Sequence, residues 1–194
     1  MITTAQQVYA LLGSSNIWDA ARQCDELLRN AGLPHAIVGG VAVCLHGYRR
    51  NTIDVDVLIR REDSPEVRAA LENAGFTWDE TNVEFRTESS VPIQFLLAHE
   101  PAGNDATFSV KLPDPADETA TVELEGLPVV SLPRLIEMKL ACGLGNPRRT
   151  HRDLADVVEL IAVHGLGRDY ARFLHKSVRK EYRKLVLQAR GERE

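Results

Sequence analysis

The sequence predicts an α/β (α+β) protein with a small mixed sheet flanked by helices and a helical C-terminal part. Short apolar runs rich in β-branched residues alternate with helix-like segments between residues 35 and 130, whereas the pattern beyond residue 131 is helical. With 194 residues, 44% of them hydrophobic, the chain can bury a core of its own. We expect an α/β core with N-terminal helices over residues 1–130 and a helical subdomain over residues 131–194.

Helices are expected where apolar residues recur at a spacing of three or four and where capping residues or proline stand near the start. The segments that meet this description are 4–12, 16–31, 41–46, 63–73, 131–142, 150–163 and 169–188. Glycine favours the left-handed conformation in which many helices end. We therefore expect the run that starts at Gly143 to end the fifth of these helices, and Gly165 to end the sixth.

Strands are expected where β-branched or aromatic residues alternate with polar ones between turn signals. These runs are 36–38, 53–59, 76–78, 83–86, 91–97, 121–124 and 127–130. The polar turn at residues 87–90 predicts a hairpin between the fourth and fifth strands. Residues 98–119 are rich in proline and aspartate, which predicts a loop with a short extended piece at 108–112.

The net charge of −5 is unevenly distributed along the chain. Residues 168–194 hold nine Lys or Arg and four acidic residues, a balance of +5, so residues 1–167 carry −10. An acidic body of this kind disfavours binding to extended duplex nucleic acid. The chain has no apolar run of membrane-spanning length and no signal-peptide pattern at its start, so we expect a cytoplasmic protein without membrane contacts.

The chemistry is predicted from residues 37–59. A short strand ends in Gly39-Gly40, a short helix follows, and Asp54-Val55-Asp56 opens the next strand. Residues two apart on a strand share a face, so the carboxylates of Asp54 and Asp56 are expected side by side. A divalent cation relieves the electrostatic repulsion between two such carboxylates. Their hard oxygen atoms are suitable ligands for Mg²⁺ or Mn²⁺.

Gly39 and Gly40 point to the anion that would accompany the cation. Without side chains, they let a phosphate approach the backbone N–H groups at a helix start. Metal-bound phosphate on one side and these N–H groups on the other predict a site for a nucleoside triphosphate (NTP). The order strand, Gly-Gly, helix, strand, Asp-x-Asp resembles the signature of the nucleotidyltransferase superfamily, which has the polymerase-β-like fold.

Within that superfamily, the chain resembles the AbiEii-type abortive-infection family of toxin nucleotidyltransferases. Three segments carry the resemblance: Arg50-Asn51-Thr52-Ile53-Asp54-Val55-Asp56, the helix segment 131–140 with Lys139, and Arg148-x-x-x-Arg152-Asp153-x-x-Asp156. The resemblance covers about residues 35–163. Eight residues, 140–147, separate Lys139 from Arg148, which is longer than the family pattern suggests.

The resemblance implies roles for individual residues. Asp54 and Asp56 would hold the metal, and Lys139 would meet the triphosphate as a catalytic cation. Asp153 or Asp156 would hold that lysine or line the site near the base. The residues assigned by this likeness to nucleotide binding are Gly39, Gly40, Arg50, Thr52, Lys139, Arg152, Asp153 and Asp156.

Gln94 departs from the superfamily pattern. The superfamily usually supplies a third carboxylate from a later strand, and the strand at 91–97 carries Gln94 where Asp is expected. An amide can ligate a metal weakly through its carbonyl oxygen but cannot accept a proton. Glu84, on the hairpin partner strand, would be the substitute if its register brings it to the same face.

Two functions follow from these patterns. The first is an Mg²⁺-dependent enzyme that transfers a nucleoside monophosphate from an NTP to a hydroxyl, with a tRNA 3′ end, a protein side chain or an antibiotic as acceptor. By resemblance, it would be the toxin of a toxin–antitoxin pair and would have an antitoxin partner. The alternative is a nucleotide-binding or regulatory module with weak or lost catalysis, because Gln94 replaces the third carboxylate.

Overall fold

In the computed structural model, which describes residues 4–11 and 15–191, seven strands form one mixed sheet in the order β3-β4-β5-β2-β1-β7-β6. The strands are β1 (His35–Val38), β2 (Val55–Ile59), β3 (Thr77–Asp79), β4 (Glu84–Arg86), β5 (Pro92–Leu97), β6 (Thr121–Leu124) and β7 (Leu127–Val130). The expected mixed α/β fold is confirmed, and so is the β4–β5 hairpin.

The centre of the sheet determines where the polar strand ends meet. β1 and β2 are antiparallel, with Val38 opposite Asp56, so the C-terminal end of β1 lies beside the start of β2. β5 runs parallel to β2 and places Gln94 opposite Asp56. β7 runs parallel to β1 on the other side. Gly39, Asp56 and Gln94 therefore gather at one edge of three neighbouring strands.

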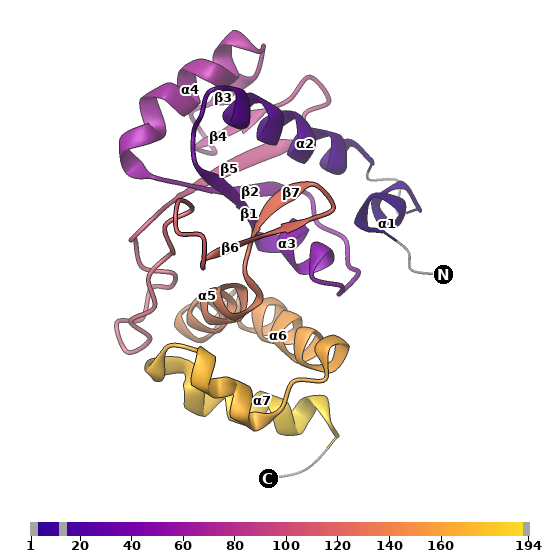
Figure 1. Ribbon diagram of the computed structural model, residues 1–194, viewed down its shortest axis with the longest axis vertical. Coiled ribbons are helices and arrows are strands. Elements are labelled where there is room, and N and C mark those ends of the chain that lie inside the picture. Colours follow the sequence, from indigo (N-terminus) through magenta and orange to yellow (C-terminus); the bar gives the residue numbers. More distant parts are fainter. Residues whose placement is uncertain (1–3, 12–14, 192–194) are drawn as a thin grey trace.

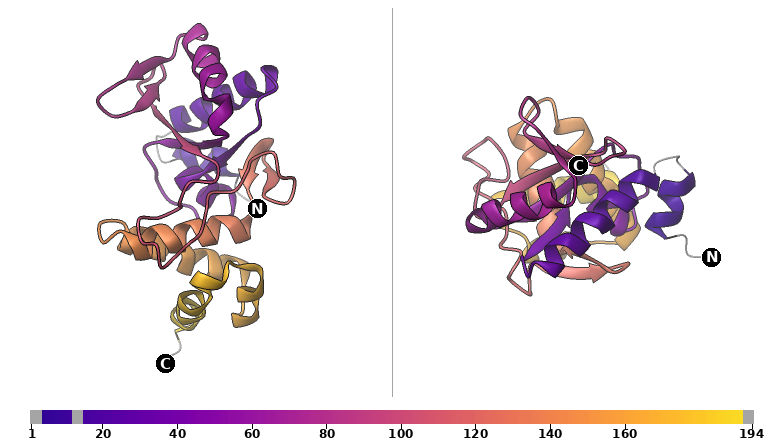
Figure 2. Two further views of the ribbon diagram at one scale, coloured as in Figure 1. Left: turned by 90° about the vertical axis from the view of Figure 1, so that its left-hand side faces the viewer. Right: turned by 90° about the horizontal axis from the view of Figure 1, so that it is seen from above.

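The α-helices cover the sheet and extend beyond it. They are α1 (Ala5–Leu11), α2 (Ser15–Asn30), α3 (Gly39–Leu45), α4 (Ser64–Asn73), α5 (Leu132–Gly145), α6 (Thr150–His164) and α7 (Arg179–Ala189). Helix α2 packs on β1, β2 and β7, and α4 packs on α2 and β3. Figures 1 and 2 show α5, α6 and α7 grouped at one end of the molecule, with α3 between them and the sheet.

One apolar core joins the sheet to the C-terminal helices. Ile37 and Val57 of the sheet are fully buried, as are Leu135 of α5, Leu160 of α6 and Tyr182 of α7, and all five belong to one cluster. The core therefore crosses the expected boundary at residue 130, and the division into two units stays a proposal.

Helix α5 is longer than predicted. We expected a break at Gly143, but the helix continues through Gly143 to Gly145. A Cβ on Gly143 would lie 3.1 Å from Cβ of Asp153 and 3.1 Å from Cδ2 of Leu154, so this glycine lets α6 pack closely. A Cβ on Gly145 would lie 2.9 Å from the backbone N of Asp105 in the adjoining loop. Both glycines serve packing rather than termination.

The predicted long helix over 169–188 is broken into three pieces. Two 3-10 helices, Arg168–Phe173 and Lys176–Val178, precede α7. Between them, Leu174 and His175 have extended backbones, and the backbone N–H of His175 donates to the buried carboxylate of Glu137 on α5. This tertiary contact explains the break, because it takes the His175 N–H away from helical bonding.

Smaller differences concern the strands. Strand β2 begins at Val55 rather than at Ile53, which lies in a bend and is 72% exposed. In the loop 98–119, the expected extended piece at 108–112 forms only a single bridge, from Lys111 to Pro101. Among the described residues, no helix is long and apolar enough to cross a membrane.

Candidate active site

Gly39 sits at the turn from β1 into α3 and touches Asp56 of the neighbouring strand. Its φ of +63° lies in the left-handed region, which glycine adopts without penalty. A Cβ on Gly39 would lie 1.8 Å from Oδ2 of Asp56. The carboxylate of Asp56 therefore lies directly against the backbone of the turn, in space that any other residue would fill.

Asp56 lies in β2, whereas Asp54 comes one residue before the strand begins, so the expectation that both aspartates stand on the strand is wrong for Asp54. Oδ1 of Asp54 accepts a hydrogen bond of 2.7 Å from the hydroxyl of Thr52. Burial and, next, the neighbouring charge of Asp54 raise the pKa of the Asp56 carboxyl to about 6, against the lowering effect of Lys139, Arg149 and Arg152. Without a cation, the ionised Asp56 is therefore held at a cost in free energy.

Gly40, Thr52 and Arg50 pack against one another beside this pair. A Cβ on Gly40 would lie 2.5 Å from Oγ1 of Thr52 and 3.3 Å from Nη1 of Arg50. Side chains of the protein thus occupy the Cβ space of Gly40, as Asp56 occupies that of Gly39, so the expected open approach for a phosphate is wrong on that side of the two glycines. Thr52 is buried and bonded to Asp54, while Nη1 of Arg50 donates to the backbone carbonyl of Asn51.

Lys139 of α5 lies between two buried carboxylates of α6. Its Nζ is 2.8 Å from Oδ1 of Asp153 and 2.9 Å from Oδ2 of Asp156. Arg149 donates to Asp153 at 2.9 Å, and Arg50 donates twice to Asp156, at 2.6 and 2.9 Å. Although burial raises it, the pKa of Asp153 lies below its usual value because of Lys139 and Arg149. These five residues form one network of two anions and three cations.

Lys139 and Arg149 of this network share a small cavity with Asp56. Its volume is about 60 Å³, and its lining includes Gly39, Asp56, Lys139 and Arg149. Sequence reasoning named Arg148 and Arg152 in this region and missed Arg149. The spacing in the sequence could have indicated Arg149, because it stands four residues before Asp153 and residues four apart share a helix face. The side chain of Arg152 is exposed, and its charge nevertheless acts on Asp56.

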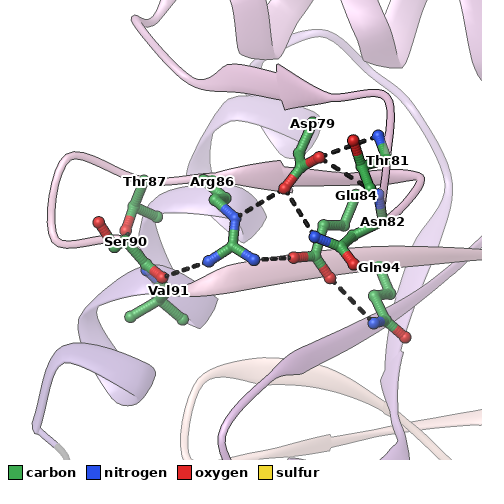
Figure 3. Close-up of polar contacts among 9 residues, drawn as sticks. All are labelled: Asp79, Thr81, Asn82, Glu84, Arg86, Thr87, Ser90, Val91 and Gln94. Atoms are coloured by element: carbon green, nitrogen blue, oxygen red, sulfur yellow. Dashed lines mark hydrogen bonds and ion pairs between the residues drawn. The ribbon is translucent and has the colours of Figure 1, made fainter.

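Gln94 and Glu84 occupy neighbouring strands beside Asp56. Nε2 of Gln94 donates to Oε2 of Glu84 at 3.1 Å (Figure 3). Glu84 is buried and forms an ion pair with Arg86. We expected Glu84 to replace the third carboxylate if the strand register brought it to the same face of the sheet. The register does bring Glu84 to the face of Gln94, but Gln94 stands between Glu84 and Asp56.

The residues present fit a hard divalent cation. Among the residues that the structure describes, no group of three or more His, Cys, Asp or Glu side chains is arranged to hold a metal. Two carboxylates, with Gln94 opposite Asp56 in the strand register, are nevertheless the kind of partial oxygen set that Mg²⁺ accepts, since it usually completes its shell with water and substrate phosphates. Asp54 and Asp56 would hold the cation.

Solved structures that align with this chain include one that is described as a candidate nucleotidyltransferase. TM1012 of Thermotoga maritima, described as a candidate nucleotidyltransferase, aligns over 72% of this chain and 92% of its own, with 17% identity and a TM-score of 0.50. JHP933 of Helicobacter pylori aligns over 90% and 89%, with 20% identity and a TM-score of 0.51. The antibiotic-resistance factor ANT(2'')-Ia aligns over 88% and 82%, with 16% identity and a TM-score of 0.42.

Sequence comparison gives the family. No curated protein matches the chain. The model of the aminoglycoside-2''-adenylyltransferase family matches residues 21–134, which is more than half of the chain and includes the Gly39 turn, Asp54, Asp56 and Gln94. Lys139 and its partners on α6 lie beyond the matched segment. The chain therefore belongs to the aminoglycoside-2''-adenylyltransferase family, and with it to the enzymes of the nucleotidyltransferase superfamily.

Proposed function

We propose that this protein is an Mg²⁺-dependent adenylyltransferase that moves AMP from ATP to a hydroxyl group. The acceptor oxygen loses its proton to water and forms a bond to the α-phosphorus, the bond from that phosphorus to the bridging oxygen breaks, and pyrophosphate leaves. The observation that carries the proposal is the Asp54–Asp56 pair, with Asp56 lying against the Gly39 backbone and its pKa raised to about 6. A bound cation would remove the cost of ionising Asp56.

Different residues of the site would bind the metal and the phosphates. Asp54 and Asp56 would hold Mg²⁺, which supplies charge stabilisation to the transferred phosphoryl group. The backbone N–H groups at Gly39 and Gly40 would bind terminal phosphates. Lys139 lines the cavity next to Asp56, and its Nζ has two carboxylate partners for three protons, so one proton remains for a phosphate oxygen.

The remaining residues of the site would position these groups or add positive charge. Asp153 and Asp156 would hold Lys139 in place, and Arg152 is close enough to contribute positive charge toward the triphosphate. Arg50 and Thr52 have their polar groups engaged by Asp156 and Asp54. We therefore assign these two residues to positioning rather than to direct contact with nucleotide.

The favoured acceptor is a hydroxyl of an amine-rich sugar, as in an aminoglycoside. The family name supports this choice. The charge of the chain supports it as well, because residues 1–167 carry −10 and attract a polycation. A tRNA 3′ end is a polyanion and gains no such attraction from this part of the chain.

A macromolecular acceptor is the second candidate. The motif from Arg50 to Asp56 resembles the AbiEii-type toxins, and the close packing of Lys139 with Asp153 and Asp156 suits the helix pair of that pattern. Under this proposal, the acceptor is a tRNA or a protein, and an antitoxin partner is expected. A module with weak catalysis is the remaining alternative, motivated by Gln94.

The experiment supplies each labelled NTP in turn with Mg²⁺ or Mn²⁺ and with an aminoglycoside, total tRNA or protein as acceptor. Asp54→Ala and Asp56→Ala are the test variants, and Asp19→Ala, at an exposed position of α2, is the matched control. We expect label on the aminoglycoside from ATP, lost by at least 100-fold in the two test variants and kept in the control. Label on RNA or protein alone would favour the second candidate, and NTP binding without any transfer would favour the weak module.

A further inference from the structure

A row of polar side chains crosses four neighbouring strands and ends at the proposed metal-binding aspartate. Asp79 of β3 is opposite Glu84 of β4, and Gln94 of β5 is opposite Asp56 of β2. The antiparallel register of β4 and β5, which pairs Phe85 with Ile93, continues to Glu84 and Gln94. Residues directly opposite one another share a face of a sheet, so the row is continuous.

Both carboxylate oxygens of Glu84 are engaged within this row. Oε1 pairs with Nη2 of Arg86, and Oε2 accepts from Nε2 of Gln94 at 3.1 Å. Arg86 is fixed in turn, since its Nε is 3.2 Å from Oδ2 of Asp79 and its Nη1 donates to the carbonyl of Ser90 (Figure 3). Glu84 is only 4% exposed, and a buried carboxylate requires such partners.

The charge of Glu84 determines how the amide of Gln94 is turned. An ionised carboxylate only accepts hydrogen bonds, so the NH₂ side of the amide must face it and the carbonyl oxygen must face away. Figure 3 shows this orientation. The strand of Asp56, β2, flanks β5 on the side opposite β4, so the Gln94 oxygen is turned away from the strand that carries Glu84. A glutamine without this partner would be free to present its NH₂ to the cation instead.

We propose that Glu84 is a positioning residue that acts through Gln94, holding the Gln94 carbonyl oxygen toward the cation bound by Asp54 and Asp56. The inference rests on the proposed function and deepens it. The third oxygen ligand is then a neutral amide, and the carboxylate that the superfamily pattern leads one to expect stands one strand further out. Glu84 itself is not a ligand, since two strand spacings, roughly 10 Å, separate its backbone from that of Asp56.

The test is a double-mutant cycle on cation affinity. Glu84→Gln, Gln94→Met and the double variant are compared with the unchanged protein, and Glu88→Gln, an exposed glutamate of the same hairpin, is the matched control. The readout is the Mn²⁺ dissociation constant from electron paramagnetic resonance without nucleotide, and the melting temperature in EDTA monitors folding. The cycle separates an effect through Gln94 from a charge effect at a distance.

We expect Glu84→Gln to weaken Mn²⁺ binding about 3- to 10-fold when Gln94 is present and to have no further effect in the Gln94→Met background. Equal weakening in both backgrounds, or no weakening in either, would overturn the inference. If Gln94→Met fails to fold, the exchange Glu84→Gln with Gln94→Glu keeps the hydrogen bond. It should bind Mn²⁺ at least as tightly as the unchanged protein, and weaker binding would count against Gln94 as a ligand.

The same measurements separate this inference from the proposed function. Mn²⁺ affinity that depends on Asp54 and Asp56 but not on Glu84 leaves the proposed function standing and removes the role of Glu84. Mn²⁺ affinity that is unaffected by Asp54→Ala and Asp56→Ala removes the cation site itself, and the proposed function fails with it.

Discussion

At the residue scale, Asp56 is a proposed metal ligand whose ionisation lowers the stability of the folded protein. Its carboxyl lies against the Gly39 backbone, next to Asp54, and its pKa is about 6 against an ordinary value of 3.8. A raised pKa means that the folded state binds the proton more tightly than the unfolded chain. The folded state therefore loses stability as the pH rises from about 4 to about 6, and the full cost applies above that window.

Replacing this carboxyl should stabilise the protein in the absence of metal. We expect Asp56→Asn to raise the free energy of unfolding by on the order of 1–2 kcal/mol at pH 8 in EDTA, and by little at pH 4. Thermal unfolding at several pH values measures this. Asp19→Asn on the surface is the control. Equal gains at pH 4 and pH 8 would contradict the assignment, because they would not depend on ionisation of Asp56.

Gly39 offers a second prediction at the same scale. Gly39→Ala must accept both a left-handed backbone at φ +63° and a Cβ placed 1.8 Å from Asp56 Oδ2. Gly165→Ala has nearly the same φ, +58°, with nothing within 4 Å of its Cβ, so it carries the backbone cost of about 1–2 kcal/mol alone. We expect both variants to lose stability and only Gly39→Ala to lose transfer activity, by at least 100-fold. Steady-state kinetics with equal activity losses in the two variants would refute the role of the contact.

At the element scale, the packing of α5 on α6 places the positive charge of Lys139 beside the site. The two helices pack closely at Gly143, and this contact aligns Lys139 with Asp153 and Asp156. The carboxylates keep Arg149 and Arg50 as partners when the lysine is absent, so the network tolerates its loss better than an isolated buried pair would.

The element-scale prediction is made for Lys139→Met. Melting temperature should fall by an amount equivalent to about 1–3 kcal/mol, and ATP affinity and turnover together should fall at least 10-fold, because the cavity beside Asp56 loses a cation. Lys184→Met, at a partly exposed position of α7 where the lysine pairs with Glu181, is the control. Isothermal titration with ATP and Mg²⁺ provides the measurement. A variant with lowered stability and unchanged ATP affinity and turnover would make Lys139 a structural residue.

At the scale of the whole molecule, the acidic charge makes acceptor binding sensitive to salt. Residues 1–167 carry −10, so a polycationic acceptor gains attraction that salt screens. We expect the KM for an aminoglycoside to rise several-fold between about 50 and 300 mM NaCl. An acetylated derivative with fewer positive charges should show a shallower rise. A KM that is independent of salt would argue against electrostatic recognition of the acceptor.

Local patterns in the sequence determined the mixed fold, the Gly39 turn and the Asp54–Asp56 pair. Each of these depends on side-chain alternation, backbone conformation or spacing over a few residues, which are local properties. Lys139, Asp153 and Asp156 were also named from the sequence, but by resemblance. The resemblance implied that Asp153 or Asp156 holds Lys139, and the packing of α5 on α6 brings both carboxylates to it.

Tertiary structure decided what depends on partners distant in the chain. Gly143 reads as a helix breaker by propensity, yet it lies inside α5, because α6 occupies the space that a side chain would need. The predicted last helix breaks at His175, because its N–H bonds to Glu137 of another helix. Strand register made Gln94 the neighbour of Asp56 and placed Glu84 behind it. Register and close packing are relations between separate segments, so a single segment does not contain them.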